Sequence, residues 1–378
     1  MALDAKHLLA KKWLERIHRL DLPEKVRIMN VCGGHERAIT MAGLRGVLPP
    51  NIELIPGPGC PVCICPEEDV YHAIQLALKE DVILVAFGDM LRVPVNVPKT
   101  EARSLEHAKA QGADIRPIAS PAEAVSIAQQ NPQRAVVFFA AGFETTTAPV
   151  AAMVAQGIPG NLSILLSGRL TRPAVAMLLD TGETSFNALI APGHVATVMG
   201  PEEWEFVVNR HHMPAAIAGF TPVSLLAAMY STLRQLIEEK PFLDNCYPEV
   251  VKPGGNTSAK RYLYDVTDVV DANWRGVGTI SHSGFALQDQ YAAHNARLLF
   301  PAYNETARKR AGQMPPGCDC ARVVLGKLYP NECRLYGAAC TPRTPIGPCM
   351  VSDEGACRIW WSGGVRESVY KSEQAVTS

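Results

Sequence analysis

Short apolar runs that alternate with longer amphipathic segments constrain the fold of this chain more than any other feature of its sequence. The runs that we predict to be buried strands are VRIMNVC, IELIPG, DVILVAFGD, RAVVFFAAGF, LSILLSG, ALIAPGHV and AAIAGF. The segments with helical spacing between them are PEEDVYHAIQLALKE, SPAEAVSIAQQ and TPVSLLAAMYSTLRQLIEE. Strands that alternate with helices of this length predict β–α–β units, and therefore an α/β fold with parallel sheets.

Two or three domains are expected, because 378 residues exceed what one hydrophobic core usually organises. The segments MNVCGGHERA and FFAAGFETTT both run from a strand through a glycine-containing turn into a helix, which favours two similar halves. We place one α/β domain at residues 1–131 and a second at residues 132–240. The third region, 241–378, begins where the regular alternation lapses, and it becomes rich in turns from QMPPGCDC onward.

Polar or glycine-containing motifs follow almost every predicted strand. They are Cys32-Gly33-Gly34-His35, Gly57-Pro58-Gly59-Cys60, Gly88-Asp89, Gly142-Phe143-Glu144-Thr145-Thr146 and Pro192-Gly193-His194. In open α/β sheets the ligand crevice lies beyond the carboxyl ends of the strands, where helix N-termini also converge. We therefore expect these motifs to meet in one cleft.

Charge and hydropathy narrow the expected partners and location. A net charge of −1 with mixed signs gives no basic field, so neither nucleic acid nor an anionic membrane is an expected partner. The segment MALDAKHLLAKKWLERIHRL predicts an amphipathic helix and not a signal peptide. The most apolar runs are far shorter than the roughly 18 residues that span a bilayer. We expect a cytoplasmic protein, in which clustered cysteines indicate metal, iron–sulfur or redox chemistry before structural disulfides.

Cysteines are concentrated near the C-terminus, among prolines and glycines. They are Cys318, Cys320, Cys333, Cys340, Cys349 and Cys357. Thiolates bind zinc or an iron–sulfur cluster, and either centre can order a segment that has little core of its own. The region has no pair of CxxC knuckles, as a zinc ribbon would, so the spacing favours iron–sulfur over zinc. Structural disulfides are the remaining alternative.

A second group of thiols follows the second predicted strand. Cys60 and Cys63 have the CxxC spacing that permits reversible disulfide chemistry, and Cys65 offers Cys63 an alternative partner. Half of a zinc site is the competing interpretation of the same spacing. The pattern alone leaves both open.

Two other motifs carry groups that can be reactive or merely structural. Cys32 and His35 lie three residues apart on a glycine-rich turn, where both can reach one metal or the imidazole can polarise the thiol. A cysteine at the end of a buried strand is, however, common in a core. Glu144 either faces the cleft or begins a helix whose polar groups are solvated.

Taken in order along the chain, these motifs resemble those of the HypD family of hydrogenase maturation factors. The motifs are VCGGH, GPGCPVC, FGDMLRVP, GFETT and APGHV. The terminal array also matches, with twelve residues between Cys320 and Cys333, six more to Cys340 and sixteen more to Cys357. The resemblance extends over nearly the whole chain.

The resemblance implies two Rossmann-like α/β domains around a cleft, plus a smaller C-terminal region that holds a [4Fe-4S] cluster. Members of the family serve, together with the small protein HypC, as the scaffold on which an iron carrying two cyanides and one carbon monoxide is assembled. HypE donates the cyanide, and the finished group is delivered to the large subunit of a [NiFe] hydrogenase. These properties are expectations for the present chain.

The resemblance also implies roles for particular residues. Cys32 is the candidate for binding the assembling iron, with His35 beside it, and Cys60 and Cys63 form a redox-active dithiol. Glu144 and the threonines after it line the cleft. The implied cluster ligands are Cys320, Cys333, Cys340 and Cys357, although Cys318 competes with Cys320 for the first position.

Three segments depart from the family pattern. The usual Thr-His after CGGH is Glu36-Arg37, the usual GFEPLD is Gly219-Phe-Thr-Pro-Val-Ser224, and the usual FDA is His294-Asn-Ala296. Carboxyl and imidazole groups expected near the cleft or the interdomain surface are therefore missing or replaced. We expect these changes to affect partner choice or a proton-handling step, and to leave the thiol framework intact.

Two other functions fit the same residues. One is an iron–sulfur-dependent oxidoreductase acting on a disulfide of a partner protein, and the other is a zinc-stabilised binding module without chemistry. A nucleotide site has no motif to support it, because the sequence contains neither G-x-G-x-x-G nor a P-loop.

Overall fold

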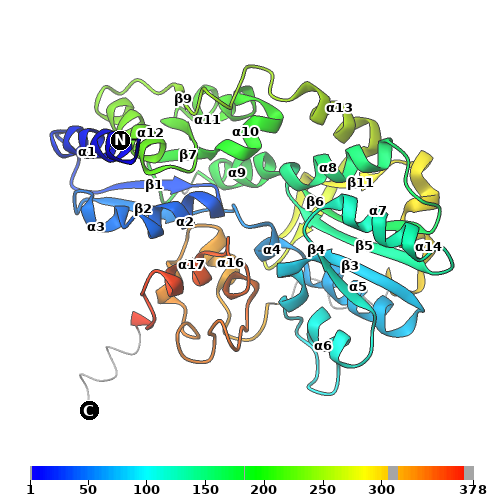
Figure 1. The fold of residues 1–378 in the computed structure, drawn as a ribbon. Coiled ribbons are helices and arrows are strands. Elements are labelled where there is room, and N and C mark those ends of the chain that lie inside the picture. Colours follow the sequence, from blue (N-terminus) through cyan, green and yellow to red (C-terminus); the bar gives the residue numbers. More distant parts are fainter. Residues whose placement is uncertain (1, 183, 305–313, 370–378) are drawn as a thin grey trace, which may run out of the picture.

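A computed structural model describes residues 2–182, 184–304 and 314–369 of the chain. It has the predicted α/β architecture with two largely parallel sheets, which Figure 1 shows side by side. The first sheet has the order β2 (Ile52–Pro56), β1 (Val26–Asn30), β7 (Ala188–Pro192), β8 (Ala215–Ala218), β9 (Leu243–Cys246). The second has the order β10 (Thr267–Trp274), β11 (Gly278–Leu287), β6 (Leu162–Arg169), β5 (Ala135–Gly142), β3 (Val82–Phe87), β4 (Ile115–Ile118).

Helices connect the strands and cover the sheets. In the first half of the chain they are α1 (Ala2–His18), α2 (Gly33–Met41), α3 (Leu44–Val47), α4 (Pro61–Ile64), α5 (Glu67–Lys79), η1 (Gly88–Arg92), α6 (Leu105–Ala110), α7 (Pro121–Gln130), α8 (Glu144–Ala155) and α9 (Thr171–Asp180). In the second half they are α10 (Gly193–Met199), η2 (Pro201–Trp204), α11 (Glu205–Asn209), α12 (Pro222–Ile237), α13 (Thr257–Val266), η3 (Asp289–His294), α14 (Ala296–Leu299), α16 (Cys320–Val324), η4 (Pro330–Glu332), η5 (Pro348–Met350) and α17 (Ala356–Ser362).

All seven predicted strands and the predicted helices are present, but the sheets do not follow the boundary that we placed at residue 131. The strands β1 and β2 lie in one sheet with β7, β8 and β9, whereas β3 and β4 lie in the other sheet with β5 and β6. Each sheet therefore contains strands from both 1–131 and 132–240. The physical reason is that apolar runs identify strands, while their partners are chosen by long-range packing that leaves no local pattern.

The region after residue 240 does not form a layer of its own. β9 is the outer strand of the first sheet, and the hairpin β10–β11 continues the second sheet, with β11 antiparallel to β6. The segment with α16 and α17 lies below α2 and beside α4 in Figure 1. The cysteine-rich part of the chain is thus packed against the first two strand–helix units.

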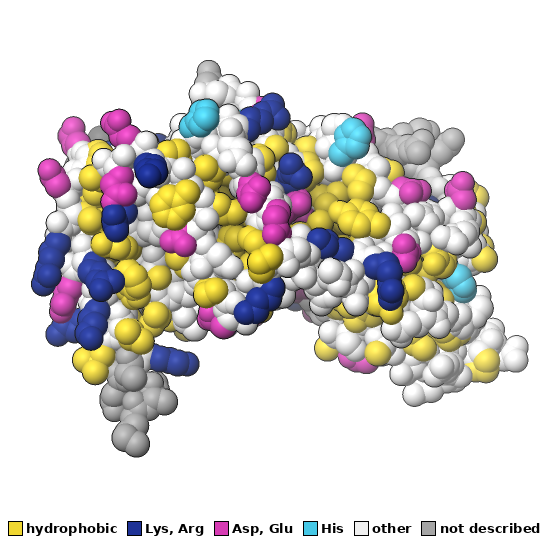
Figure 2. Space-filling view, turned by 90° about the horizontal axis from the view of Figure 1, so that it is seen from above, with side chains coloured by type: hydrophobic (Ala, Val, Ile, Leu, Met, Phe, Trp, Pro, Cys, Tyr) yellow, Lys and Arg dark blue, Asp and Glu magenta, His cyan; other side chains and the backbone are white. Residues whose placement is uncertain are grey.

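The surface carries both signs of charge. On the face seen from above, lysines and arginines are mixed with acidic side chains, and hydrophobic side chains lie between them (Figure 2). Within the part of the chain that the structure describes, every helix is too short or too polar to cross a membrane.

A buried ion pair fastens the turn of the β10–β11 hairpin to the start of α5. The Arg275 guanidinium donates to the Glu67 carboxylate over 3.1 Å and to the carbonyl oxygen of Pro94 over 2.7 Å. Both side chains are almost fully buried. The Arg275 backbone N–H also donates to Ile64, the last residue of α4. The ion pair joins the second sheet to α5, and the backbone bond joins it to α4, the helix that contains Cys63.

The variant Glu67→Gln removes the negative charge but keeps the shape of the side chain. We expect its free energy of unfolding to fall by about 3 kcal/mol, because the buried guanidinium loses its counter-charge. Urea unfolding followed by tryptophan fluorescence measures the change. The matched control is Asp81→Asn, since Asp81 is an exposed partner of Arg134 and its loss is expected to cost less than about 1 kcal/mol. Equal effects of the two variants would contradict a structural role for the buried pair.

Candidate functional site

The turns after β1 and β2 contact each other through their backbones. These strands are parallel neighbours with Asn30 opposite Pro56, so their carboxyl ends reach the same edge of the sheet. The Gly33 N–H donates to the carbonyl oxygen of Gly59 over 3.1 Å. A Cβ atom at Gly59 would lie 2.3 Å from the Cα of Cys32, so only glycine fits there. Two of the predicted motifs are thereby brought together.

Cys32 is the N-cap residue of α2 and is half-buried. Burial raises the pKa of its thiol to about 12, and the nearby charge of Glu354 acts in the same direction. The backbone N–H groups of His35 and Gly34 oppose this shift, because they stabilise the thiolate. The sulfur therefore keeps its proton at neutral pH until a soft cation displaces it.

His35 presents one unused ring nitrogen. Its side chain is fully buried, and Nε2 lies 2.9 Å from the carbonyl oxygen of Ala218, so Nε2 carries the hydrogen. Nδ1 is buried and has no hydrogen-bond partner among the described residues. Burial lowers the pKa of His35 to about 4, which keeps the ring neutral. A neutral imidazole with a free lone pair can accept a proton or bind a metal.

Aromatic rings form the wall next to His35. The Phe220 ring lies between His35 and His194, at centroid distances of 4.9 Å and 3.8 Å. This contact brings the predicted motif Pro192-Gly193-His194 to the same edge of the first sheet as Cys32-Gly33-Gly34-His35. Three of the predicted motifs therefore converge.

Cys60 and Cys63 form a disulfide, with their Cα atoms 5.3 Å apart. Cys60 caps α4, and its sulfur accepts a hydrogen bond from the backbone N–H of Cys63. Both residues are almost fully buried. They belong to one continuous hydrophobic core with the cysteines of the C-terminal segment. The disulfide thus lies between the Cys32 turn and those cysteines.

Cys65 faces away from this arrangement, toward the second sheet. Its sulfur lies 3.5 Å from the hydroxyl oxygen of Ser167, and that hydroxyl donates to the Asp69 carboxylate over 2.6 Å. Arg297 completes the network with a 2.6 Å bond to Asp69. The contacts of Cys65 are therefore with a polar network inside the fold.

The C-terminal cysteines gather closely, but not in the expected grouping. The sulfur atoms of Cys320, Cys349 and Cys357 lie within 4.8 Å of one another. The sequence placed Cys349 in the C-terminal group of cysteines, but the family spacing gave it no role as a ligand. Cys318 is also adjacent, with its sulfur 3.4 Å from that of Cys320. The predicted ligands Cys333 and Cys340 are buried nearby but lie outside this triad.

The donor set fits a soft metal centre. Its members are buried thiols, and contact with Cys320 raises the pKa of Cys349 well above its ordinary value. Burial likewise raises the pKa of Cys333 and of Cys340. Clustered thiols that resist ionisation are stabilised when a metal replaces their protons. The triad can therefore hold a metal ion or part of a metal cluster.

Two carboxylates near Cys32 come from other segments. A Cβ atom at Gly33 would lie 2.5 Å from the Cβ of Glu354, so the loop before α17 is packed against the Cys32 turn. Asp89 accepts a hydrogen bond from Ser352 in the same loop, over 3.1 Å, and burial raises the pKa of Asp89. The sequence flagged Asp89 through its strand-end motif, whereas no local pattern marked Glu354.

The residues that depart from the family pattern make internal contacts. Glu36 is buried and accepts hydrogen bonds from Asn30, Arg45 and the Trp360 indole, so it joins α2 to α17. Ser224 bridges the backbones of Gly219 and Cys246. The His294 ring bonds the carbonyl oxygen of Leu162, and Arg37 is exposed, 3.8 Å from Asp353.

Glu144 lies at the start of α8 and binds the start of α9. Its carboxylate accepts from the backbone N–H and the hydroxyl of Thr171, over 2.7 and 2.8 Å. None of its hydrogen bonds reaches Cys32, His35 or the disulfide. Burial raises the pKa of Glu144 from 4.5 to about 7. Its clearest role in the structure is to join two helices at the carboxyl ends of β5 and β6.

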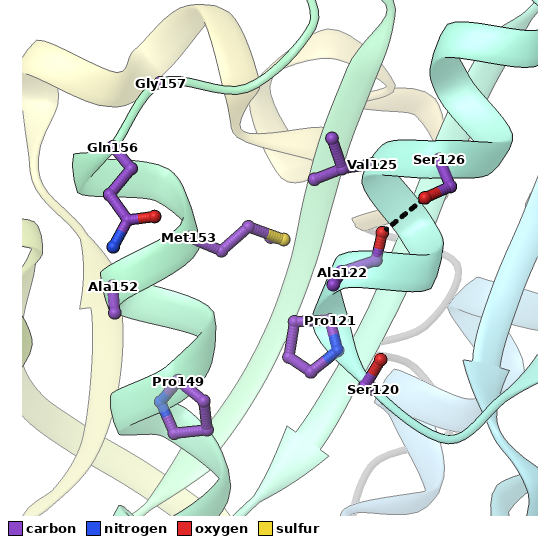
Figure 3. Close-up of a pocket in the computed structure, with 10 residues that line it drawn as sticks. All are labelled: Ser120, Pro121, Ala122, Val125, Ser126, Pro149, Ala152, Met153, Gln156 and Gly157. Carbon is purple, nitrogen blue, oxygen red and sulfur yellow. Dashed lines mark hydrogen bonds between the residues drawn. The ribbon is translucent and has the colours of Figure 1, made fainter.

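A separate pocket lies between α7 and α8, on the outer side of the second sheet (Figure 3). Its volume is about 540 Å³, and its walls include Pro121, Val125 and Met153. It contains none of the predicted site residues.

The raised pKa of Glu144 predicts a pH dependence of stability. Between about pH 4.5 and 7 the folded chain holds a proton that the unfolded chain has released, so stability falls as the pH rises. From about pH 5.5 to 8 this group should remove about 2 kcal/mol of unfolding free energy, and Glu144→Gln should remove that part of the dependence. Urea unfolding of both proteins at the two pH values measures it. Parallel pH profiles would show that the carboxyl titrates normally.

Comparison with known proteins assigns the family. Residues 8–364 match the family model HypD, described as the hydrogenase formation hypA family. The chain is 39% identical to hydrogenase maturation factor HypD2 of Bradyrhizobium diazoefficiens, over 89% of each chain. It is 38% identical to hydrogenase maturation factor HypD of Escherichia coli, over 91% of this chain and 90% of that one. The chain therefore belongs to the HypD family of hydrogenase maturation factors.

Proposed function

We propose that this protein is a scaffold on which the iron group of a [NiFe] hydrogenase, carrying two cyanides and one carbon monoxide, is assembled. The observation that carries the proposal is the position of Cys32. Its half-buried thiol lies on a helix N-terminus, on a turn in backbone contact with the turn that leads into the Cys60–Cys63 disulfide. A thiolate is a soft, electron-rich ligand, and such ligands suit low-spin iron with strong-field partners. The iron is cargo, and Cys32 is its anchor.

Neighbouring groups have supporting roles in this proposal. The unpartnered Nδ1 atom of His35 keeps a neutral lone pair, which can serve as a second ligand of the iron. Glu354 packs against the Cys32 turn, and burial together with the charge of Asp89 raises its pKa to about 7. A cation bound at the site would favour the ionised form of this carboxyl group. The Phe220 ring limits access of water from the side of β8.

We further infer that Cys320, Cys333, Cys340 and Cys357 hold a resident [4Fe-4S] cluster. Such a cluster exchanges one electron at a time, whereas the Cys60/Cys63 pair exchanges two. Cys60, Cys63 and these four cysteines share one core, which supports electron exchange between them. In this scheme the dithiol supplies or stores reducing equivalents for the chemistry at Cys32.

The proposal includes partners of the kind that the family uses. A HypC-like chaperone shares the iron, a HypE-like protein donates cyanide, and the finished group passes to the large subunit of a hydrogenase. The cytoplasm suits this work, because the cysteines outside the single disulfide need a reducing compartment to stay free.

An alternative is an iron–sulfur-dependent oxidoreductase that acts on a disulfide of a partner protein. The shared core of the disulfide and the C-terminal cysteines supports this function as well. The two functions differ in their product, which is a reduced partner in one and a bound iron group in the other. A zinc-stabilised binding module would have neither product.

The anchor is tested with Cys32→Ala, purified without oxygen together with its HypC-like partner. We expect the infrared bands of iron-bound cyanide and carbon monoxide to disappear, because the iron loses its thiolate. The control is Cys246→Ala, which removes another half-buried free thiol at the far strand of the first sheet. Bands that persist in the Cys32 variant would refute the anchor. Turnover of a protein disulfide without any bands in the wild type would favour the alternative.

The cluster is tested by metal analysis of single variants. The wild type should contain about four iron and four sulfide per chain. Cys357→Ala should lose most of both, while Cys349→Ala should retain them, since Cys349 lies outside the family spacing. If Cys349→Ala loses the cluster and Cys333→Ala keeps it, the triad in the structure supplies the ligands instead. Stoichiometric zinc in the wild type would exclude the cluster.

A further inference from the structure

We propose that a basic hollow beside the C-terminal cysteines is the docking surface for an acidic one-electron carrier protein. We call it the arginine hollow. It is lined by Arg92, Glu106, Thr341, Pro342, Arg343, Arg358, Trp361 and Arg366. The inference rests on the proposed function, because it assumes that the cysteines hold an iron–sulfur cluster.

The charge of the hollow is strongly one-sided. Four arginines line it against a single glutamate, although the whole chain has a net charge of only −1. Arg92 lies 3.8 Å from Glu106, and Arg358 lies 3.8 Å from Asp353. Arg343 and Arg366 are exposed and have no acidic partner within residues 2–182, 184–304 and 314–369. Two guanidinium groups are therefore left to attract an acidic surface.

The walls of the hollow are the segments that carry the cysteines. Arg358 directly follows Cys357, and Arg343 is three residues beyond Cys340. Both cysteines are buried, with exposed fractions of 5% and 7%. A protein docked in the hollow would therefore contact the segments that carry Cys340 and Cys357. The buried thiols would keep water out while leaving a short path for an electron.

An aromatic pair joins the hollow to the cysteine core. The Trp361 ring lines the hollow and makes an edge contact with Tyr336, at 6.2 Å between centroids. Tyr336 is almost fully buried, belongs to the same core as the cysteines and forms a β-bridge with Cys340. The floor of the hollow is thus continuous with the packing around the cluster ligands.

The shape of the hollow fits a protein better than a small anion. Its volume is about 1010 Å³, and it is wide open to solvent. Its arginines come from η1, from the loop after Cys340, from α17 and from the segment after α17, so they are distributed along a rim. Distributed rim charges raise the association rate of a complementary protein, whereas a small anion needs donors that converge on it.

The electron balance requires such a carrier. Opening the Cys60–Cys63 disulfide takes two electrons and two protons and yields two thiols. A reduced carrier docked in the hollow gives up one electron per encounter and leaves oxidised. Two encounters, with two protons from solvent, complete the reduction.

The test uses the full chain with its cluster and a reduced, acidic [2Fe–2S] ferredoxin as the probe. Calorimetry measures binding, and stopped-flow absorbance measures cluster reduction, at about 20 and 300 mM salt. We expect Arg343→Glu/Arg366→Glu to weaken binding and slow reduction by about tenfold or more at low salt. High salt should diminish the difference, since it screens exposed charges.

A matched double variant controls for net charge. Lys12→Glu/Arg19→Glu makes the same change of four charge units on α1 and the turn that follows it. This helix packs on α12 through Trp13 and Tyr230, away from α17. We expect it to bind and react like the wild type. If both double variants are equally impaired, or if the hollow variant matches the wild type, the docking surface is elsewhere.

Reduction by dithionite separates this inference from the proposed function. A chain whose absorbance dithionite does not change has no reducible cluster, and then the proposed function fails first. A chain that dithionite reduces but reduced ferredoxin neither binds nor reduces at low salt contradicts the docking surface alone.

Discussion

The parallel pairing of β1 with β2 is the constraint on which the rest of this structure depends. It places the ends of both strands at one edge, where the Cys32 turn and the Gly59 turn touch through their backbones. No side chain separates them, since a Cβ atom at Gly59 would overlap Cys32. The Cys32 thiol and the Cys60–Cys63 disulfide are thereby held on adjacent turns by backbone contacts. Sites built on strand ends are positioned more precisely than sites on long loops.

The C-terminal segment packs against the Cys32 turn and the helix α2 that follows it. The loop that contains Glu354 packs against Gly33, and the Trp360 indole donates to the buried Glu36 carboxylate. Arg45 supplies the counter-charge for Glu36, with 2.8 Å between the groups. Loss of these partners would destabilise the fold, because a buried carboxylate without compensating hydrogen bonds and a counter-charge costs free energy. They fix α17, and with it Cys357, relative to the helix that begins at Cys32.

Much of the fold followed from the sequence, and the exceptions have physical causes. Continuous apolar runs identified the seven buried strands. The edge strand β4 was missed, because it has only four residues and contains Pro117, which is tolerated at a sheet edge. The β10–β11 hairpin was missed because its first strand is only partly buried and interrupts its apolar residues with polar ones. The boundary placed at residue 131 does not separate the two sheets, because strand pairing is decided by contacts between distant segments.

In the candidate site, sequence motifs marked some residues, whereas others come from distant parts of the chain and are recognised only in the structure. Strand-end motifs marked Cys32, His35, Cys60 and Cys63, since their spacing is local. The sequence gave Cys349 no ligand role and did not mark Glu354, because only the fold brings Cys349 to Cys357 and Glu354 to Gly33. Glu36 was noticed as a departure, yet its bond to Trp360 spans most of the chain.

The Glu36–Trp360 bond couples the packing of α17 to the helix that follows Cys32. Metal sites of this kind order the segments that carry their ligands, and α17 carries both Cys357 and Trp360. If the C-terminal cysteines bind a metal centre, as we propose, its loss would therefore also loosen the packing of α17 on α2 beside Cys32. The proposed iron site would then be complete only in a chain that already holds its own metal centre.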